Sequence, residues 1–208
     1  APFKSFDLEE AFHLDENQYP DIADAIKVMK VWSVDRSGAI TDTNATLVYK
    51  WIYSCYFSIN DSMEKRFAVD RDAKIAYFVQ GVRVAKALML RDFGKLNVPL
   101  GDFQRHQRGD IDLPTSGGPD MWNAKYGDNY GKGKIRVTAG ESYILLAKFM
   151  KGQLPQLRSI ACFGSSNTPG AKHFTDQMEL YNNQQTKEES LSKDWAYKHA
   201  ERIYHPGE

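Results

Sequence analysis

The chain has 208 residues, and its 27 lysines and arginines balance its 27 aspartates and glutamates, which gives a formal net charge of zero. A chain of this length can enclose a hydrophobic core, but a neutral chain lacks the electrostatic field that attracts nucleic acid or anionic membranes. No apolar stretch approaches the ~20 residues that a membrane-spanning helix needs. We therefore expect neither nucleic acid nor a membrane as a partner.

The first part of the chain, about residues 20–94, has apolar residues at the spacing of helices. A first helix is expected just after Pro20. Thr43 is placed to cap a second helix, which is apolar nearly all round and should therefore be buried. A third helix is expected over about 73–93, where Gly94 is suited to end it.

Residues 95–133 have a different composition, in which Gly, Pro, Asp and Asn dominate. This segment is expected to be one long loop, anchored by aromatic side chains such as Phe103 and Trp122. Loops of this length are uncommon unless they carry a function or pack against other structure.

An alternation with period two then replaces the helical spacing. It predicts three strands, over 134–139, 142–150 and 157–163. Gly140-Glu141 and Lys151-Gly152 supply the turns, so an antiparallel meander is expected.

A loop over 167–177 follows the strands, and Ser192 is placed to cap a last helix over about 193–203. A helical part, a loop and a strand-rich part over 134–208 together indicate the α+β class, in one segment covering residues 1–208.

The serine, histidine and aspartate near the end of the chain could suggest nucleophilic catalysis. Gly164-Ser165-Ser166 lacks the second glycine of a nucleophile elbow, so a turn at the end of a strand explains it better. His173 and Asp176 could be a general base and the group that orients it. We favour the alternative that they satisfy backbone groups in a loop.

Asp102, Asp110 and Asp112 could suggest calcium, but the glycine and glutamate of an EF-hand loop are not in place. Solvated or helix-capping roles explain these aspartates better. The basic cluster Arg105-His106-Gln107-Arg108 is flanked by Asp102 and Asp110, so internal ion pairing is expected there. We assign no metal-binding and no cofactor-binding residue.

Cys55 and Cys162 lie far apart in the sequence and belong to no CxxC pair. Two buried thiols are the favoured interpretation, because cysteine behaves as a small hydrophobic residue. A disulfide between them stays open for an exported protein.

An ordered series of short motifs carries a family resemblance. These motifs are Gly101-Asp102-Phe103-Gln104-Arg105, Gly117-Gly118-Pro119-Asp120, Ala139-Gly140-Glu141-Ser142-Tyr143, Gly164-Ser165-Ser166 and His173-Phe174-Thr175-Asp176-Gln177. In this order they resemble the C-terminal part of the large subunit of penicillin acylase-type N-terminal-nucleophile hydrolases, which include penicillin amidases and acyl-homoserine-lactone acylases. Two positions depart from the family pattern, Leu100 where a tryptophan often stands and Glu141 where an aspartate stands.

The resemblance implies a four-layer αββα fold and a nucleophilic serine at the start of the large subunit. In such enzymes the free α-amine of the serine acts as its own general base. Ala1 has an amine but no hydroxyl, so we expect no catalytic residue in this fragment and no activity from it alone. The resemblance further implies a periplasmic or secreted parent, and a parent that can bind calcium, although no ligand matches here.

The expected substrates of the parent are linear acyl amides: acyl-homoserine lactones, penicillin-like amides or acylated peptides, a chemistry that belongs to antibiotic metabolism. The partners would be the small subunit and the N-terminal part of the large subunit. This fragment would be scaffold, with the segment from Thr43 to Tyr49 as one wall of an acyl pocket. The alternative is a self-contained sugar- or peptide-binding module built on Trp122, Tyr126 and Tyr130.

Overall fold

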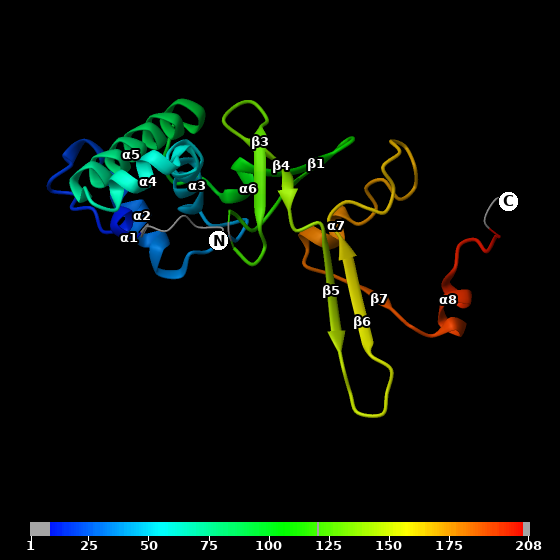
Figure 1. Cartoon of the computed structure of the whole chain (residues 1–208). Coiled ribbons are helices and arrows are strands. Elements are labelled where there is room, and N and C mark those ends of the chain that lie inside the picture. The colour runs from blue at the N-terminus through cyan, green and yellow to red at the C-terminus, as the bar shows by residue number, and fades with distance from the viewer. Residues whose placement is uncertain (1–8, 120, 206–208) are drawn as a thin grey trace. The chain divides into compact units, whose positions relative to one another are not determined.

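Helices fill most of the first hundred residues of the chain, and strands follow them (Figure 1). The computed structural model describes residues 9–119 and 121–205. Ala1 and Asp120, which carry part of the expectations above, lie outside them. The chain divides into unit 1, residues 1–140, and unit 2, residues 141–208, and each has a sheet of its own. The fold class is mixed α+β, as predicted.

From residue 9 onward, eight helical segments make up the first part of unit 1, and the three longest of them pack together. The segments are α1 (Glu9–Phe12), the 3-10 turn η1 (Pro20–Ile22), α2 (Ala23–Asp35), α3 (Ala45–Ser54), the 3-10 turn η2 (Tyr56–Ser58), α4 (Asp61–Phe67), α5 (Arg71–Phe93) and α6 (Leu100–Phe103). The first, second and third predicted helices correspond to α2, α3 and α5. The sequence pattern did not show α1 or α4.

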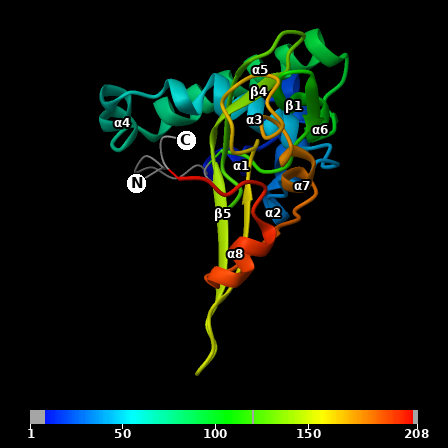
Figure 2. The same cartoon turned by 90° about the vertical axis from the view of Figure 1, so that its right-hand side faces the viewer.

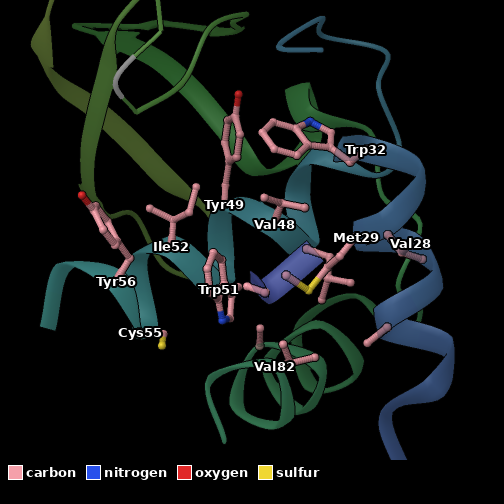
Figure 3. Packing of buried hydrophobic residues seen from close by; sticks show 14 of the residues in the cluster. Val28, Met29, Trp32, Val48, Tyr49, Trp51, Ile52, Cys55, Tyr56 and Val82 are labelled. Atoms are coloured by element: carbon pink, nitrogen blue, oxygen red, sulfur yellow. The ribbon is translucent and has the colours of Figure 1, made fainter. Parts of the chain in front are cut away.

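Helix α3 lies at the centre of the hydrophobic core, in contact with both α2 and α5. Every residue from Ala45 to Ile52 is buried, which confirms the expectation of a helix covered all round. Figure 3 shows why this is so: Tyr49 and Trp51 leave α3 in opposite directions, and Trp51 points toward Val82 of α5.

Side chains and one glycine fix where the helices begin and end. Asn60 caps α4 and Asp70 caps α5, each with a side-chain oxygen that accepts backbone N–H groups of the first turn. Gly94 ends α5 in the left-handed region, at φ +69°, and its N–H donates to the Leu90 carbonyl at 3.0 Å, as predicted.

The predicted cap of α3 is wrong. Asn44 occupies the cap position, and the carboxylate of Asp42 accepts the N–H groups of Asn44 and Ala45 at 2.7 and 3.3 Å. Thr43 is exposed. A charged acceptor one residue earlier therefore takes over the role of the threonine hydroxyl, in keeping with the positive end of the helix dipole.

The prediction of one long loop over residues 95–133 is also wrong, because three strands and helix α6 lie there. Unit 1 has a four-stranded sheet in the order β2-β1-β4-β3. Its strands are β1 (Gln104–Arg108), β2 (Ile111–Pro114), β3 (Lys125–Asn129) and β4 (Ile135–Gly140). The two central strands, β1 and β4, run parallel, and each outer strand pairs antiparallel with its neighbour.

The predicted strand over 134–139 is confirmed as β4, but it does not belong to a meander with the next two strands. Strand β4 pairs with β1 and β3, and the chain leaves this sheet at Gly140. Gly140 has φ +129°, and a Cβ there would lie 2.0 Å from the Ala124 carbonyl oxygen. The pair Gly140-Glu141 is thus a close backbone contact and not a hairpin turn.

Unit 2 is built on the other two predicted strands. Strands β5 (Tyr143–Lys148) and β6 (Gln156–Ala161) form an antiparallel hairpin, which can be followed in the two views of Figures 1 and 2. The predicted turn is confirmed, with Gly152 at φ +74°. The short strand β7 (Lys187–Glu189) completes a sheet in the order β5-β6-β7.

Two short helices complete unit 2, α7 (Met178–Asn182), which packs against β6, and α8 (Lys193–His199). The Ser192 hydroxyl accepts the Trp195 N–H at 3.3 Å and caps α8, as predicted. Helix α8 ends four residues earlier than the expected Ile203. No helix among the described residues has both the length and the apolar character required to cross a membrane.

Both cysteines are thiols. Cys55 is buried in unit 1, where burial raises the pKa of its thiol to about 12. Cys162 of unit 2 is only half-buried, so the favoured interpretation of two buried thiols holds in full for Cys55 alone.

Candidate functional site

The loop between β6 and α7 holds the predicted serine, histidine and aspartate. The His173 ring is engaged at both nitrogens: Nδ1 lies 2.6 Å from Asp176 Oδ2, and Nε2 lies 3.2 Å from Glu201 Oε2. Lys172 pairs with the same Glu201 carboxylate. We call these four side chains the His173 cluster. Glu201 lies 28 residues away in the sequence, so spacing alone could not reveal it.

The contacts of His173 do not support a role as the base for a nearby serine. Asp176 raises the pKa of His173 through its hydrogen bond, and Glu201 raises it further. A general base needs one ring nitrogen at the hydroxyl group from which it takes a proton, and here carboxylates contact both ring nitrogens. His173 and Asp176 contact each other, and His173 also contacts Glu201, so these are contacts between side chains and not with backbone groups, which corrects the favoured interpretation above.

Ser166 has a structural role in the turn. Its hydroxyl oxygen accepts the Thr168 N–H at 3.1 Å, and its own N–H donates to the His173 carbonyl at 2.9 Å. A Cβ at Gly164 would lie 2.2 Å from the same carbonyl oxygen, so only glycine fits. No helix begins directly after Ser166, as an elbow would require. The prediction of a turn at the end of a strand is confirmed.

One basic residue of the predicted cluster in unit 1, Arg105, pairs with one of the predicted acidic residues, Asp112. Arg105 Nε lies 2.8 Å from Asp112 Oδ1, and these two are diagonal neighbours on the antiparallel strands β1 and β2. Internal pairing is therefore confirmed for Arg105, although its partner is Asp112 and not Asp102 or Asp110. His106 is buried in the same strand.

The residues present do not fit a calcium site. In residues 9–119 and 121–205, no three or more His, Cys, Asp or Glu side chains come together as metal ligands would. Asp102 and Asp110 are exposed, and the Asp112 carboxylate is engaged by Arg105.

A cluster that the sequence analysis missed lies where α3, α5 and the β3–β4 hairpin meet. Lys50 Nζ lies 2.9 Å from Asp92 Oδ2 and donates to the Gly133 carbonyl at 2.9 Å. Only 8% of the Lys50 side chain and 7% of the Asp92 side chain are exposed. We call this the Lys50–Asp92 site. A lysine inside a helix that is otherwise apolar all round was the available signal.

The surroundings of the Lys50–Asp92 site favour the charged form of Asp92. Arg91 Nε lies 2.7 Å from Asp92 Oδ1, and this hydrogen bond, together with the one from Lys50, lowers the pKa of Asp92 despite burial. The Lys50 ammonium also lies 5.3 Å from the ring centroids of both Phe93 and Phe103.

Gly133 allows the β3–β4 hairpin to approach Asp92 and Lys50 closely. It has φ +72°, and a Cβ at this position would lie 2.3 Å from the Asp92 carboxylate. Any side chain here would push the hairpin away from α5 and remove the carbonyl that Lys50 uses.

The Lys50–Asp92 site borders a cavity of about 590 Å³. The residues that line it come from α3, α5, the end of α6 and the β3–β4 hairpin, and all belong to unit 1.

The segment proposed as an acyl-pocket wall does not border that cavity. From Ala45 to Tyr49 it is buried in the core. Burial raises the pKa of Tyr49, whose hydroxyl donates to the Gly117 carbonyl at 3.1 Å. A Cβ at Gly118 would lie 2.1 Å from the Tyr49 hydroxyl. The absence of a side chain at Gly118 therefore allows the backbone of this loop to contact the Tyr49 hydroxyl.

The aromatic residues of the binding-module alternative make separate contacts. Trp122 is 97% exposed. The Tyr126 ring packs on Phe57, with 6.1 Å between ring centroids, and the Tyr130 ring lies 5.8 Å from the Arg136 guanidinium. These contacts do not indicate a shared stacking platform.

A comparison with known families accounts for the motifs. A model described as penicillin amidase matches residues 18–196, which is most of the chain and spans parts of both units. The match lends no support to the binding-module alternative. It does support the resemblance found in the ordered motifs, several of which prove to be close backbone contacts. The chain therefore belongs to the penicillin amidase family of N-terminal-nucleophile hydrolases, whose members hydrolyse amides.

Proposed function

We propose that this chain is the C-terminal scaffold of an acylase large subunit, and that the serine nucleophile is supplied by another part of the parent protein. The observation that carries this proposal is the family match over residues 18–196, combined with a loop in which His173 contacts two carboxylates and the Ser166 hydroxyl accepts a backbone N–H of its own turn. The scaffold would hold in place a sheet to which the rest of the acylase contributes strands, in a four-layer αββα arrangement.

The parent reaction would be hydrolysis of a linear acyl amide, with acyl-homoserine lactones, penicillin-like amides and acylated peptides as candidate substrates. The serine hydroxyl attacks the amide carbonyl, and the free α-amine of that serine takes the proton. Hydrogen-bond donors of an oxyanion hole stabilise the negative charge, the amine leaves, and water releases the acid.

The exposed surface of unit 2 supports the rest of the acylase as the partner. Tyr143, Leu145 and Leu146 lie on both faces of strand β5, and each is more than half exposed. A strand with apolar residues on both faces is typical of the interior of a larger, covered sheet. We also propose that the parent is periplasmic or secreted, as the family resemblance implies.

An activity assay of the purified chain tests the absence of a nucleophile. The chain, assayed on octanoyl-homoserine lactone and on a chromogenic phenylacetyl amide, should give no turnover above the buffer rate. The Ser166→Ala and Ser165→Ala variants should behave identically to the unmodified chain. Turnover that Ser166→Ala abolishes and Ser165→Ala retains would show that the nucleophile lies in this chain.

A reconstitution assay tests the scaffold role. The same chain, co-expressed with an acylase portion headed by serine from the same reading frame, should co-purify with it and hydrolyse one of these amides. A portion that is fully active without this chain would contradict the proposal.

A further inference from the structure

The cavity beside the Lys50–Asp92 site has the size and the lining of a small-molecule pocket. Its volume of about 590 Å³ lies within the range of roughly 300–1,000 Å³ that is usual for ligand pockets. One part of the lining is apolar and comprises Tyr53, Leu88, Phe103 and Ile135. Another part is cationic and comprises Arg91, Lys132 and Lys134.

The lining carries an excess of positive charge. Lys50 and Asp92 neutralise each other, and Asp92 is the only acidic residue among the described residues that line the cavity. Arg91 approaches Asp92 through Nε alone, and 67% of its side chain is exposed. In the ion pairs found across the described residues, neither Lys132 nor Lys134 has a carboxylate partner.

The two lysines sit on a turn that its own hydrogen bonds hold in place. Asn129 Oδ1 accepts the Gly131 N–H at 2.9 Å, and the Lys134 N–H donates to the Gly131 carbonyl at 3.0 Å. Lys132 adopts the left-handed region, with φ +49°. Non-glycine residues rarely adopt this conformation and often do so at ligand sites.

We propose that this cavity binds a small carboxylate that has an apolar body, such as a medium-chain or aryl-substituted acid. The carboxylate would pair with Arg91, Lys132 and Lys134, and the apolar body would lie against Leu88 and Phe103. Charge-assisted hydrogen bonds select the anionic head, and the apolar wall selects against small hydrophilic anions. The inference requires no amidase activity and is tested by binding alone.

A titration of the full-length, isotope-labelled chain with sodium octanoate or sodium phenylacetate tests the site, with backbone amide spectra as the readout. Saturable shifts are expected at Gly131 and Gly133 of the hairpin. The Lys132→Ala/Lys134→Ala double variant should bind at least ~10-fold more weakly, the loss expected from one charge-assisted contact. Lys65→Ala, an exposed lysine outside the cavity, should leave the affinity unchanged.

A second pair of variants tests the apolar wall. Leu88→Asp places a carboxylate on the wall and should abolish binding, whereas Leu90→Asp, two residues along α5 and outside the cavity, should not. Octan-1-ol and inorganic phosphate should bind at least ~10-fold more weakly than octanoate, since each lacks one of the two required features. Equal affinity for octanol or phosphate, or an octanoate affinity that the lysine double variant leaves unchanged, would overturn the proposal.

Discussion

Lys50 shows how a buried charge is accommodated at the scale of a single residue. A charge removed from water is costly unless an opposite charge and further hydrogen bonds replace the lost hydration. Here one carboxylate, one backbone carbonyl and the faces of two aromatic rings surround the ammonium group. The pair therefore depends on all three segments that form the site, and removal of either partner leaves the other uncompensated.

Loss of the Lys50 charge should destabilise the chain. Lys50→Met should lower the free energy of unfolding by about 3 kcal/mol, because Asp92 is left buried with Arg91 as its remaining partner. Lys50→Met/Asp92→Leu should cost less than the single change, since no charge is left behind. Arg66→Ala, which breaks the exposed pair with Asp70, should cost at most ~0.5 kcal/mol. Urea denaturation measures all three, and equal losses for Lys50→Met and Arg66→Ala would contradict the role of burial.

The stability that the His173 cluster contributes should depend on pH. Because the pKa of His173 is raised above its ordinary value of 6.5, the His173 cluster stabilises the loop fully below that pH, and this contribution is lost as the pH rises through the folded pKa. Asp176→Asn removes the main cause and should lower the pKa of His173. Titration of the imidazole signals by NMR measures the change. A pKa that is the same in both proteins would contradict the assigned partner.

At the scale of elements, the crossing of α3 and α5 depends on one glycine. A Cβ at Gly81 would lie 2.6 Å from the Cβ and Sγ atoms of Cys55 and 2.9 Å from the Trp51 indole nitrogen. All three residues are buried, so the neighbouring atoms have little room to move. The absence of a side chain at this position therefore sets how closely the two helices approach.

Gly81→Ala should consequently destabilise the chain by about 1–3 kcal/mol through overpacking. This sign is opposite to the gain of ~1 kcal/mol that helix propensity alone would give to the same change. Ala87→Gly, at an exposed position of the same helix, serves as the reference and should cost ~1 kcal/mol. Thermal unfolding followed by circular dichroism distinguishes the two cases, and a stabilised Gly81→Ala variant would contradict the close packing.

The elements that sequence reasoning predicted are those in which apolar residues carry the periodicity. Helix α5 and strands β4, β5 and β6 belong to this group. Strand β1 was missed because its residues are all polar, although their burial alternates: Gln104 and His106 are 0% and 1% exposed. The Gln104 side-chain amide nitrogen lies within hydrogen-bond distance of three backbone carbonyls, from Thr115 to Gly117, so backbone groups make the burial of this polar side chain possible.

In the candidate sites, too, the sequence could reveal only the local features. The pair His173–Asp176 is local and could be read from spacing, whereas Glu201, its further partner, is brought in by tertiary structure. Lys50 and Asp92 lie 42 residues apart, in helices whose relative placement no local pattern specifies. The parallel pairing of β1 with β4 could not be predicted either, because no local pattern specifies which distant strands pair.

At the scale of the whole molecule, the exposed apolar surface of unit 2 is the most consequential property. Strand β5 is the edge strand of its sheet, and its unpaired backbone groups accompany the exposed side chains of Tyr143, Leu145 and Leu146. Exposed edges of this kind pair readily with another strand. The isolated chain should therefore self-associate.

Light scattering measures this self-association directly. Leu145→Lys should shift the chain toward the monomer, because a charge on the edge strand opposes pairing between strands. Leu90→Lys is the matched control in unit 1, since Leu90 is 46% exposed and Leu145 is 51% exposed, and it should have no effect. If the unmodified chain is monomeric, or if the two substitutions have equal effects, β5 is not the surface of association.

The Lys50–Asp92 site also imposes an order on the assembly of unit 1. The two charges belong to helices, whereas the carbonyl that completes the site comes from Gly133, 83 residues after Lys50. Contacts between segments closer in sequence form faster, so we expect the ion pair, 42 residues apart, to form in water before the hairpin docks and excludes that water. The cost of dehydrating two charges thus falls on the step that completes the sheet, and this couples the late stage of folding to the ionic strength of the solution.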